Sequence, residues 1–389
     1  MLSWEEHFTE RNAQLPTRRQ RLIKTSGNAR YLTTNSQQLL NFISNDYLGL
    51  SSHEEIRAAF HRASSRYGIG SSGAPSLSGY SEEHHELAAA LAQWLGYAQC
   101  LLFSSGYQLN SSIFSQLVDN NTWVWLDKRC HASHIDGIRL AQAKFTTFNA
   151  ATLETTLLKI ASQPQRRHLI LSEGSFSMDG TCNYWNKLIH FKAANPANVL
   201  LVIDDAHGIG ALGARGHGTL EQLGLNFAMI DLVIGTFGKA FGTHGGFICG
   251  AAPLIDYLQQ SVRSQIFSTN LPPALAAATR CSLALITSSH GQKLRAKLTA
   301  TISYFQQLAT HADLNCSATN YSAIQLLSYS DSRSVTACHN HLLARQIIVG
   351  KMLYPTVPKA TPRLRISLNA CHKAADLESL IAHLGGAGV

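Results

Sequence analysis

Apolar and polar residues alternate along the chain in a pattern typical of α/β proteins. Between about residues 40 and 280, short apolar runs are separated by segments of helix length, and the clearest runs are 100–103, 122–126, 168–172, 199–204 and 232–237. Buried runs of this length between helices are typical of parallel βαβ units. We therefore expect an α/β fold with a mostly parallel central sheet and helices on both of its faces.

The two ends of the chain have different patterns. Residues 1–45 predict an amphipathic helix followed by a polar, basic arm, and residues 46–285 are expected to form the large domain, which would carry the ligand site. The last part, 286–389, is predicted to be a smaller α+β domain. Its expected elements are a mainly helical stretch over 283–309, strands at 323–327, 347–349 and 364–368, and a last helix over 374–384.

Composition and charge exclude several classes of protein. The chain has 389 residues, of which 45% are hydrophobic and 14% charged, and its net charge is +8. Its 32 Lys and Arg are spread out and not interleaved with aromatic residues, so we predict no nucleic-acid partner. No apolar run approaches the roughly 18 residues of a membrane span. The N-terminus lacks an apolar signal segment, and we expect a cytoplasmic protein without membrane contact.

The eight cysteines include no C-x-x-C pair, which favours buried thiols over disulfides. The nearest approach to a metal cluster is Cys338-His339-Asn340-His341, and we predict no metal site.

The strongest chemical feature is a single lysine in a glycine-flanked loop. The apolar run 232–237 leads directly to Gly238-Lys239-Ala240-Phe241-Gly242. A lysine held partly out of water there has a lowered pKa and can form a Schiff base with an aldehyde. An ordinary solvent-exposed loop lysine is the alternative. A nucleotide-binding P-loop is excluded because Ala240 stands where that motif needs Ser or Thr.

A second feature ends the apolar run 199–203. Asp204 and His207 follow it, and the carboxyl ends of parallel strands meet at one edge of the sheet. We therefore expect Asp204 near Lys239, where it can pair with the pyridine nitrogen of pyridoxal phosphate (PLP), with His207 near the phenolic oxygen. Strand-end turn carboxylates are the alternative. The following Gly208-Ile-Gly-Ala-Leu-Gly213 matches a dinucleotide fingerprint, but its spacing from the strand favours an irregular loop.

Two further segments complete a possible cofactor site. Ser104-Ser105-Gly106-Tyr107 joins an apolar run to a helix start, and backbone N–H groups at a helix start can bind a phosphate. His131 follows the run 122–126 at the same predicted edge and could stack on a flat ring.

Together these motifs resemble the α-oxoamine synthases, PLP enzymes with the aspartate-aminotransferase-like fold. The resemblance covers almost the whole chain. It rests on Asn45–Leu50, Gly68–Gly73, Ser78–Tyr80, Glu173–Gly180, Asp204–Gly208, Thr236–Gly242 and Phe267–Pro273.

The resemblance implies how the cofactor ring is held. Lys239 would carry PLP and later remove the substrate's α proton, and Asp204 would pair with the pyridine nitrogen. His131 would stack on the ring, with Ser177 and His207 around the ring oxygen.

It also implies a phosphate site at Gly106, Tyr107 and Thr236. Ser268 and Thr269 would reach the cofactor of a partner subunit, so a homodimer with shared active sites is expected.

Within the family, the chain is most similar to members that join L-alanine to a pimeloyl group carried on coenzyme A or acyl carrier protein. Its length, Leu2-Ser-Trp-Glu5 and Pro355-Thr356-Val-Pro358 carry that similarity. Arg363 would hold the amino-acid carboxylate, Thr356 would lie at the substrate, and Arg19 would meet the distal carboxylate. Arg18 and Arg21 are alternatives to Arg19.

Three other interpretations remain open. A sister synthase that joins glycine to acetyl-coenzyme A shares every core motif. An aminotransferase would use the same cofactor for another reaction. A basic nucleic-acid-binding protein would bind no cofactor.

Overall fold

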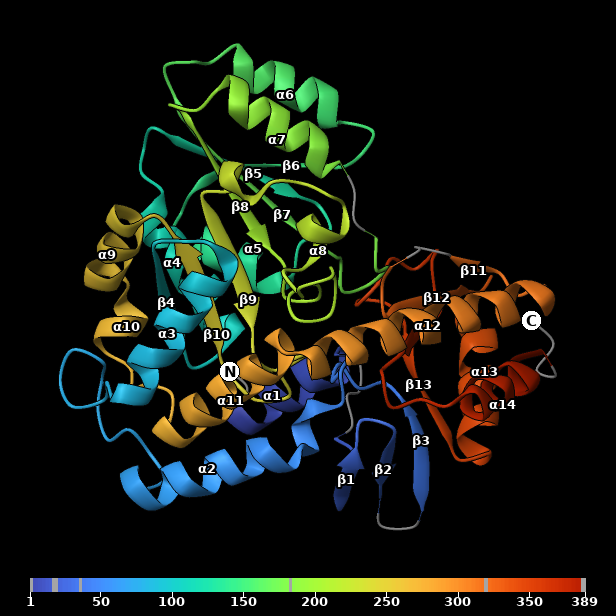
Figure 1. The fold of residues 1–389 in the computed structure, drawn as a ribbon. Helices are drawn as coiled ribbons and strands as arrows, with labels where there is room; N and C mark the ends of the chain where they lie inside the picture. Colours follow the sequence, from blue (N-terminus) through green and yellow to red (C-terminus); the bar gives the residue numbers. More distant parts are fainter. Residues whose placement is uncertain (1–2, 16–19, 35–36, 182–183, 318–320, 386–389) are drawn as a thin grey trace.

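The central element is a mostly parallel, seven-stranded sheet (Figure 1). The computed structural model describes residues 3–15, 20–34, 37–181, 184–317 and 321–385. The strand order is β4-β10-β9-β8-β7-β5-β6, and β10 alone runs antiparallel to its neighbours. This confirms the expected fold class. The strands are β4 Gln99–Phe103, β5 Thr122–Asp127, β6 Lys144–Phe148, β7 Arg167–Glu173, β8 Val199–Asp204, β9 Leu232–Thr236 and β10 Gly246–Gly250.

Helices cover both faces of this sheet, as expected (Figure 1). Alternate residues of β7 show why: Leu169 and Leu171 belong to one buried apolar cluster, and Ile170 belongs to another. Strands buried on both faces are apolar at nearly every position. The helices of this part are α2 Glu54–Tyr67, α3 Glu82–Leu95, α4 Gly106–Leu117, α5 Ala132–Leu140, α6 Leu153–Ala161, α7 Trp185–Ala194, α8 Thr219–Gln222, α9 Ala252–Ser261 and α10 Arg263–Ile266, with 3-10 turns at Leu50–Ser52 and Phe227–Met229.

The second sheet joins the two ends of the chain. Its order is β1-β2-β3-β13-β14-β12-β11, so three strands of the predicted arm extend the C-terminal sheet. The link is parallel pairing of β3 with β13, from Ile347 opposite Leu40 to Val349 opposite Phe42. The strands are β1 Thr25–Asn28, β2 Tyr31–Thr33, β3 Gln38–Phe42, β11 Cys316–Ser317, β12 Ile324–Ser328, β13 Ile347–Met352 and β14 Arg363–Ser367; the helices are α11 Pro273–Thr287, α12 Ser289–His311, α13 Ser332–Ala344 and α14 Ala374–Gly385.

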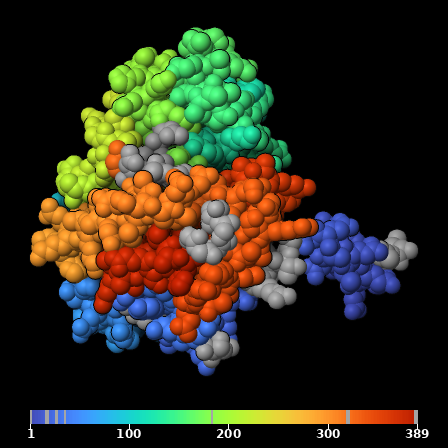
Figure 2. Space-filling view, turned by 90° about the vertical axis from the view of Figure 1, so that its right-hand side faces the viewer, coloured from blue at the N-terminus to red at the C-terminus, as the bar shows by residue number. Residues whose placement is uncertain are grey.

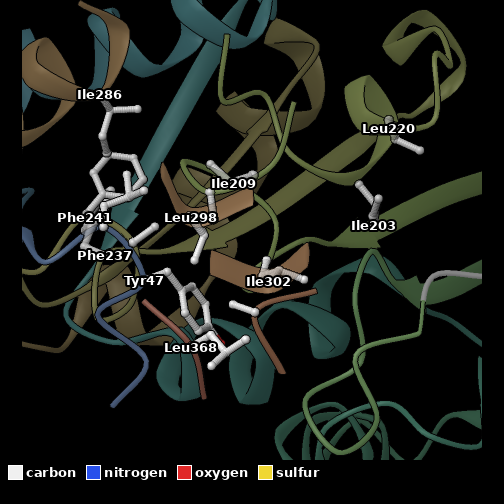
Figure 3. Close-up of a cluster of buried hydrophobic side chains, with 14 of the residues drawn as sticks. Tyr47, Ile203, Ile209, Leu220, Phe237, Phe241, Ile286, Leu298, Ile302 and Leu368 are labelled. Atoms are coloured by element: carbon white, nitrogen blue, oxygen red, sulfur yellow. The ribbon is translucent and has the colours of Figure 1, made fainter. Parts of the chain in front are cut away.

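One apolar core runs through both sheets. Leu298 and Ile302 of α12 lie close to Ile209 of the large domain and to Tyr47 and Leu368 (Figure 3). Because protein interiors are close-packed, this continuous core fixes the C-terminal sheet against the large domain.

The N-terminal helix α1, Trp4–Ala13, extends away from this body (Figure 2). Ser3 begins it with a reciprocal capping box to Glu6. None of its residues is buried, and Trp4 and Phe8 stack on each other, 5.7 Å between ring centroids. Within the described residues, no helix is both long and apolar enough to traverse a lipid bilayer.

A bidentate ion pair fastens the arm to the last helix. Arg30 Nε and Nη2 each donate to Asp376 at 2.7 Å, and the two side chains are 17% and 7% exposed. Asp376 also accepts from its own helix start, at Lys373 N. Paired charges shielded from water contribute more to stability than exposed ones.

We expect Arg30→Met to lower the free energy of unfolding by about 1–3 kcal/mol, because it leaves a half-satisfied buried carboxylate. The matched control is Arg66→Met, which removes the exposed pair to Glu82, with side chains 66% and 57% exposed. That loss should be at most about 1 kcal/mol. Urea unfolding at pH 7 measures both, and equal losses would contradict the role assigned to Arg30.

Candidate active site

Three parallel strands deliver polar residues to one edge of the central sheet. Glu173 ends β7, Asp204 ends β8 directly opposite it, and Thr236 ends β9. They border a cavity of about 190 Å³. Its lining consists of Gly106, Tyr107, Asn110, His131, Ser133, Glu173, Ser177, Asp204, Ala206, His207, Ile234, Gly235, Thr236 and Lys239.

Asp204 is the buried anion of this cavity. Its Oδ2 accepts hydrogen bonds from Asn110 Nδ2 at 3.0 Å and from the His134 ring at 2.9 Å, and its Oδ1 accepts from Ala206 N at 3.0 Å. Burial alone would raise the pKa of this carboxyl, but the donors and the charge of Lys239 lower it below its ordinary value. Asp204 is therefore ionised at neutral pH.

The pKa of Glu173 is shifted in the opposite direction from that of Asp204. Burial, and then the negative charge of the adjacent Asp204, raise the pKa of Glu173. Its Oε1 accepts from His131 N at 2.6 Å. Two neighbouring carboxyls whose environments separate their pKa values are typical of functional sites.

Lys239 lies in the turn that follows β9 and is partly buried. Burial lowers its pKa to about 8, although Asp204 and Glu173 oppose the shift. The turn closes with a hydrogen bond from Gly242 N to Lys239 O at 2.9 Å. Gly242 has φ of 66°, and a Cβ there would collide with the backbone of Ser51, so this position requires glycine.

His207 is held by Tyr47. Its Nδ1 is 2.6 Å from Tyr47 Oη, which leaves Nε2 for a ligand in the cavity. Burial, followed by the positive charges of Lys239 and Arg365, lowers the pKa of His207 well below its ordinary value. His207 is therefore neutral at physiological pH.

The segment after His207 is an irregular loop, as the sequence predicts. Gly210 and Gly213 have φ of 86° and 81°, and the next helix, α8, begins only at Thr219. The glycine pattern therefore does not open a helix as a dinucleotide site requires.

The start of α4 forms an anion cradle. Ser105 caps this helix by accepting from Gln108 N at 3.1 Å, so the first N–H groups, at Gly106 and Tyr107, face the helix start. Thr236 adds a hydroxyl that donates to Gly245 O at 2.9 Å. A Cβ on residue 246 would come within 2.9 Å of the backbone of Gly106. Glycine at position 246 therefore leaves room for the start of α4.

The remaining predicted residues lie at various distances from this cavity. His131 and Ser177 line it. Ser268 contacts α4 of its own chain, with Gln108 Nε2 donating to its Oγ at 3.1 Å, and Thr269 is exposed beside it. Thr356 is exposed. Arg19 and Arg18 lie outside the described residues.

Two arginines of β14 differ in position. Arg363 Nε donates to Thr361 O at 3.0 Å, and this residue is not among those lining the cavity. Arg365 is buried, donating to Ser177 O at 2.9 Å and to Asn45 Oδ1 at 3.1 Å. After burial, which is the main cause, its charge also lowers the pKa of Lys239 and His207. Arg365 does not line the cavity either, but it is the arginine of this strand whose charge acts on these two cavity residues.

Sequence reasoning missed several residues of this site. Glu173 could have been found by the strand-end rule that found Asp204, because it ends an apolar run. Asn110 and His134 follow Gly106 and His131 at helical spacings of four and three, which turn their side chains to the same neighbourhood. No comparable local signal marks Tyr47.

Comparisons with known proteins show the family of the chain. The family model for class I and II aminotransferases matches residues 37–384. The 8-amino-7-oxononanoate synthases of Salmonella enteritidis PT4 and Salmonella typhi are each 36% identical to this chain over the full length of both proteins. The chain belongs to the 8-amino-7-oxononanoate synthase family. Enzymes of this family are PLP-dependent acyltransferases.

Solved structures support the fold. A Sphingomonas wittichii serine palmitoyltransferase matches with a TM-score of 0.90 and 25% identity, covering 99% of this chain and 96% of that one. The 8-amino-7-oxononanoate synthase of Francisella tularensis matches with a TM-score of 0.77 and 27% identity, covering 90% and 97%.

The residues present fit PLP. An ionised carboxylate suits a protonated pyridine nitrogen, the amine of Lys239 suits the aldehyde, and the N-terminus of α4 with Thr236 suits the phosphate. His207 Nε2 is free to meet the ring oxygen, and His131 lies at the cavity wall.

The pKa of Lys239 predicts how apoprotein captures PLP. Because only the neutral amine attacks the aldehyde, the capture rate should rise with pH, reach half of its maximum near pH 8 and level off above it. Capture by N-acetyl-lysine, measured in parallel, should keep rising to roughly pH 10.4. Borohydride reduction followed by peptide mass spectrometry should locate the cofactor on Lys239 and find none in Lys239→Ala. Identical pH profiles for protein and model amine would contradict the lowered pKa.

Proposed function

We propose that this protein catalyses the decarboxylative condensation of L-alanine with a pimeloyl thioester, giving 8-amino-7-oxononanoate, carbon dioxide and free thiol. The observation that carries the proposal is the constellation of Lys239, Asp204 and His207 around one cavity, in a chain of this family. The bond formed joins the α carbon of alanine to the thioester carbonyl carbon. Two bonds are broken: the C–S bond of the thioester, and the bond between the α carbon of alanine and its carboxylate carbon.

The chain's own residues divide the work. When bound, PLP supplies an aldehyde that joins reversibly to amines and a ring that accepts the electron pair left by a departing α proton. Lys239, with its lowered pKa, is suited to take that proton as a general base near neutral pH. Asp204, ionised and fixed by three donors, is suited to hold a proton on the pyridine nitrogen.

Other residues orient the reactants. Neutral His207, fixed by Tyr47, can exchange hydrogen bonds with the ring oxygen or the acyl carbonyl without adding charge. His131 would cover the ring face. The protonated form of Glu173 at neutral pH limits the negative charge beside Asp204, so that only one of the two carboxyls faces the cofactor as an anion.

Assembly and location belong to the same proposal. We infer a homodimer in the cytoplasm, with Ser268 and Thr269 near the partner subunit's cofactor. The acyl group would arrive on coenzyme A or acyl carrier protein, and Thr356 and one of Arg18, Arg19 and Arg21 remain predicted substrate contacts. For the amino-acid carboxylate, we propose the buried Arg365 in place of Arg363, which the resemblance implies.

The substrate pair is tested by thiol release from PLP-loaded protein. L-Alanine with pimeloyl-coenzyme A should release thiol, and glycine with acetyl-coenzyme A should release little. Release with the glycine pair alone would move the protein to the sister synthase. Silence with both pairs would be followed by pimeloyl-acyl carrier protein, and silence there as well would overturn the proposal.

The carboxylate partner is tested by matched arginine variants. Arg365→Gln should raise the KM for L-alanine by about 10-fold or more, the loss expected for one charge-assisted hydrogen bond, with PLP still bound. Arg363→Gln should raise it much less, because that guanidinium is bonded to Thr361. The reverse order would restore Arg363 to the role that the resemblance implies.

A further inference from the structure

His134 is a buried histidine beside the cofactor-pairing carboxylate. It lies in the first turn of α5, three residues after His131, and its side chain is fully buried. Its Nε2 is 2.9 Å from Asp204 Oδ2. The ring of Phe114 meets it edge-on, with 6.1 Å between ring centroids. His134 does not line the cavity, so it acts on a ligand through the cavity residues that it contacts: Asp204, and Asn110, whose Nδ2 is 3.3 Å from His134 Nε2.

The proton of this contact can be assigned from the partners. An ionised carboxylate only accepts hydrogen bonds, so His134 Nε2 must carry the hydrogen. The other nitrogen, Nδ1, is buried and has no hydrogen-bond partner among the described residues. A proton on Nδ1 would therefore be buried without an acceptor, which is unfavourable. The neutral tautomer with hydrogen on Nε2 satisfies both conditions.

The donors on Asp204 are distributed unequally. Oδ2 receives both side-chain donors, His134 and Asn110, whereas Oδ1 receives the backbone N–H of Ala206. Two donors on one oxygen stabilise the negative charge of the carboxylate and make it a weaker competitor for a proton. They also fix its rotation, because Oδ2 is anchored on the side of α4 and α5.

We propose that His134 is a positioning residue that keeps Asp204 ionised and oriented, so that the proton between Asp204 and the cofactor stays on the pyridine nitrogen. This rests on the PLP site described above. An aliphatic side chain would pack against Phe114 equally well, but it would leave Asp204 with one side-chain donor fewer. The carboxylate would then compete better for the shared proton, and the ring would lose part of its capacity to accept electrons.

The test uses holoenzyme loaded with PLP labelled with ¹⁵N in the ring. Its chemical shift distinguishes pyridinium from neutral pyridine without any turnover. His134→Leu should move the signal toward neutral pyridine. His134→Gln, whose amide can donate from nearly the same place as Nε2, should restore the pyridinium value. The control is His168→Leu, which removes another buried histidine, bonded to Trp125 and Gln163 at the opposite end of β7.

A second measurement follows exchange of the α proton of L-alanine in D₂O without an acyl donor. His134→Leu should slow it by about 10-fold or more, the size expected for one hydrogen bond to a charged group. His134→Gln and His168→Leu should stay near the wild-type rate. An unchanged ¹⁵N shift and exchange rate in His134→Leu would overturn the proposal. Absence of exchange in the wild-type enzyme would count against the proposed function instead, since the ¹⁵N shift still tests His134.

If His134→Leu fails to fold, the wild-type protein decides the matter. Histidine-selective ¹⁵N labelling, with the His134 signals assigned by their loss in His134→Gln, should give the tautomer with hydrogen on Nε2 and none on Nδ1. The opposite tautomer would mean that His134 cannot donate to Asp204 and would overturn the proposal.

Discussion

The site depends on keeping one carboxylate charged in a place that water hardly reaches. Burying an isolated anion is very unfavourable, and the usual outcome is that the group takes up a proton. Glu173 and Asp205 follow that rule, since burial raises the pKa of each. Asp204 is the exception, although it lies opposite Glu173 in the sheet and directly precedes Asp205 in the sequence. The difference lies in the donors: helices α4 and α5 each direct one side chain at the same oxygen of Asp204.

That arrangement follows from how parallel strands are joined. Each strand enters the sheet from the same end, so β7, β8 and β9 finish together, and the helix that follows a strand begins at this edge. The first turn of α4 thus supplies both the phosphate cradle and, one turn later, Asn110. The first turn of α5 supplies His131 to the cavity and His134 to Asp204. The residues that line the cavity and the residues that hold Asp204 in place therefore come from the same first turns of α4 and α5.

The sequence predicted what depends on local pattern. The parallel strands, the lysine turn and the strand-end Asp204 were confirmed in place, because apolar runs and glycines report local constraints. Strands β1 to β3 were not foreseen, since the polar arm becomes a sheet only by pairing with β13, more than three hundred residues away in sequence. Antiparallel β10 was also missed, because nothing in Gly246–Gly250 reveals strand direction.

The two arginines of β14 show a limit of another kind. Arg363 and Arg365 are two residues apart, so strand alternation puts both on the same face, and a motif that contains both cannot separate them. What separates them is depth. Arg365 lies where the C-terminal sheet meets the large domain, and its guanidinium joins Asn45 of the N-terminal segment to Ser177 of the loop after β7. A substrate carboxylate bound there would therefore contact a residue that already holds three parts of the chain together. Binding at that point would couple substrate position to the packing of the two sheets.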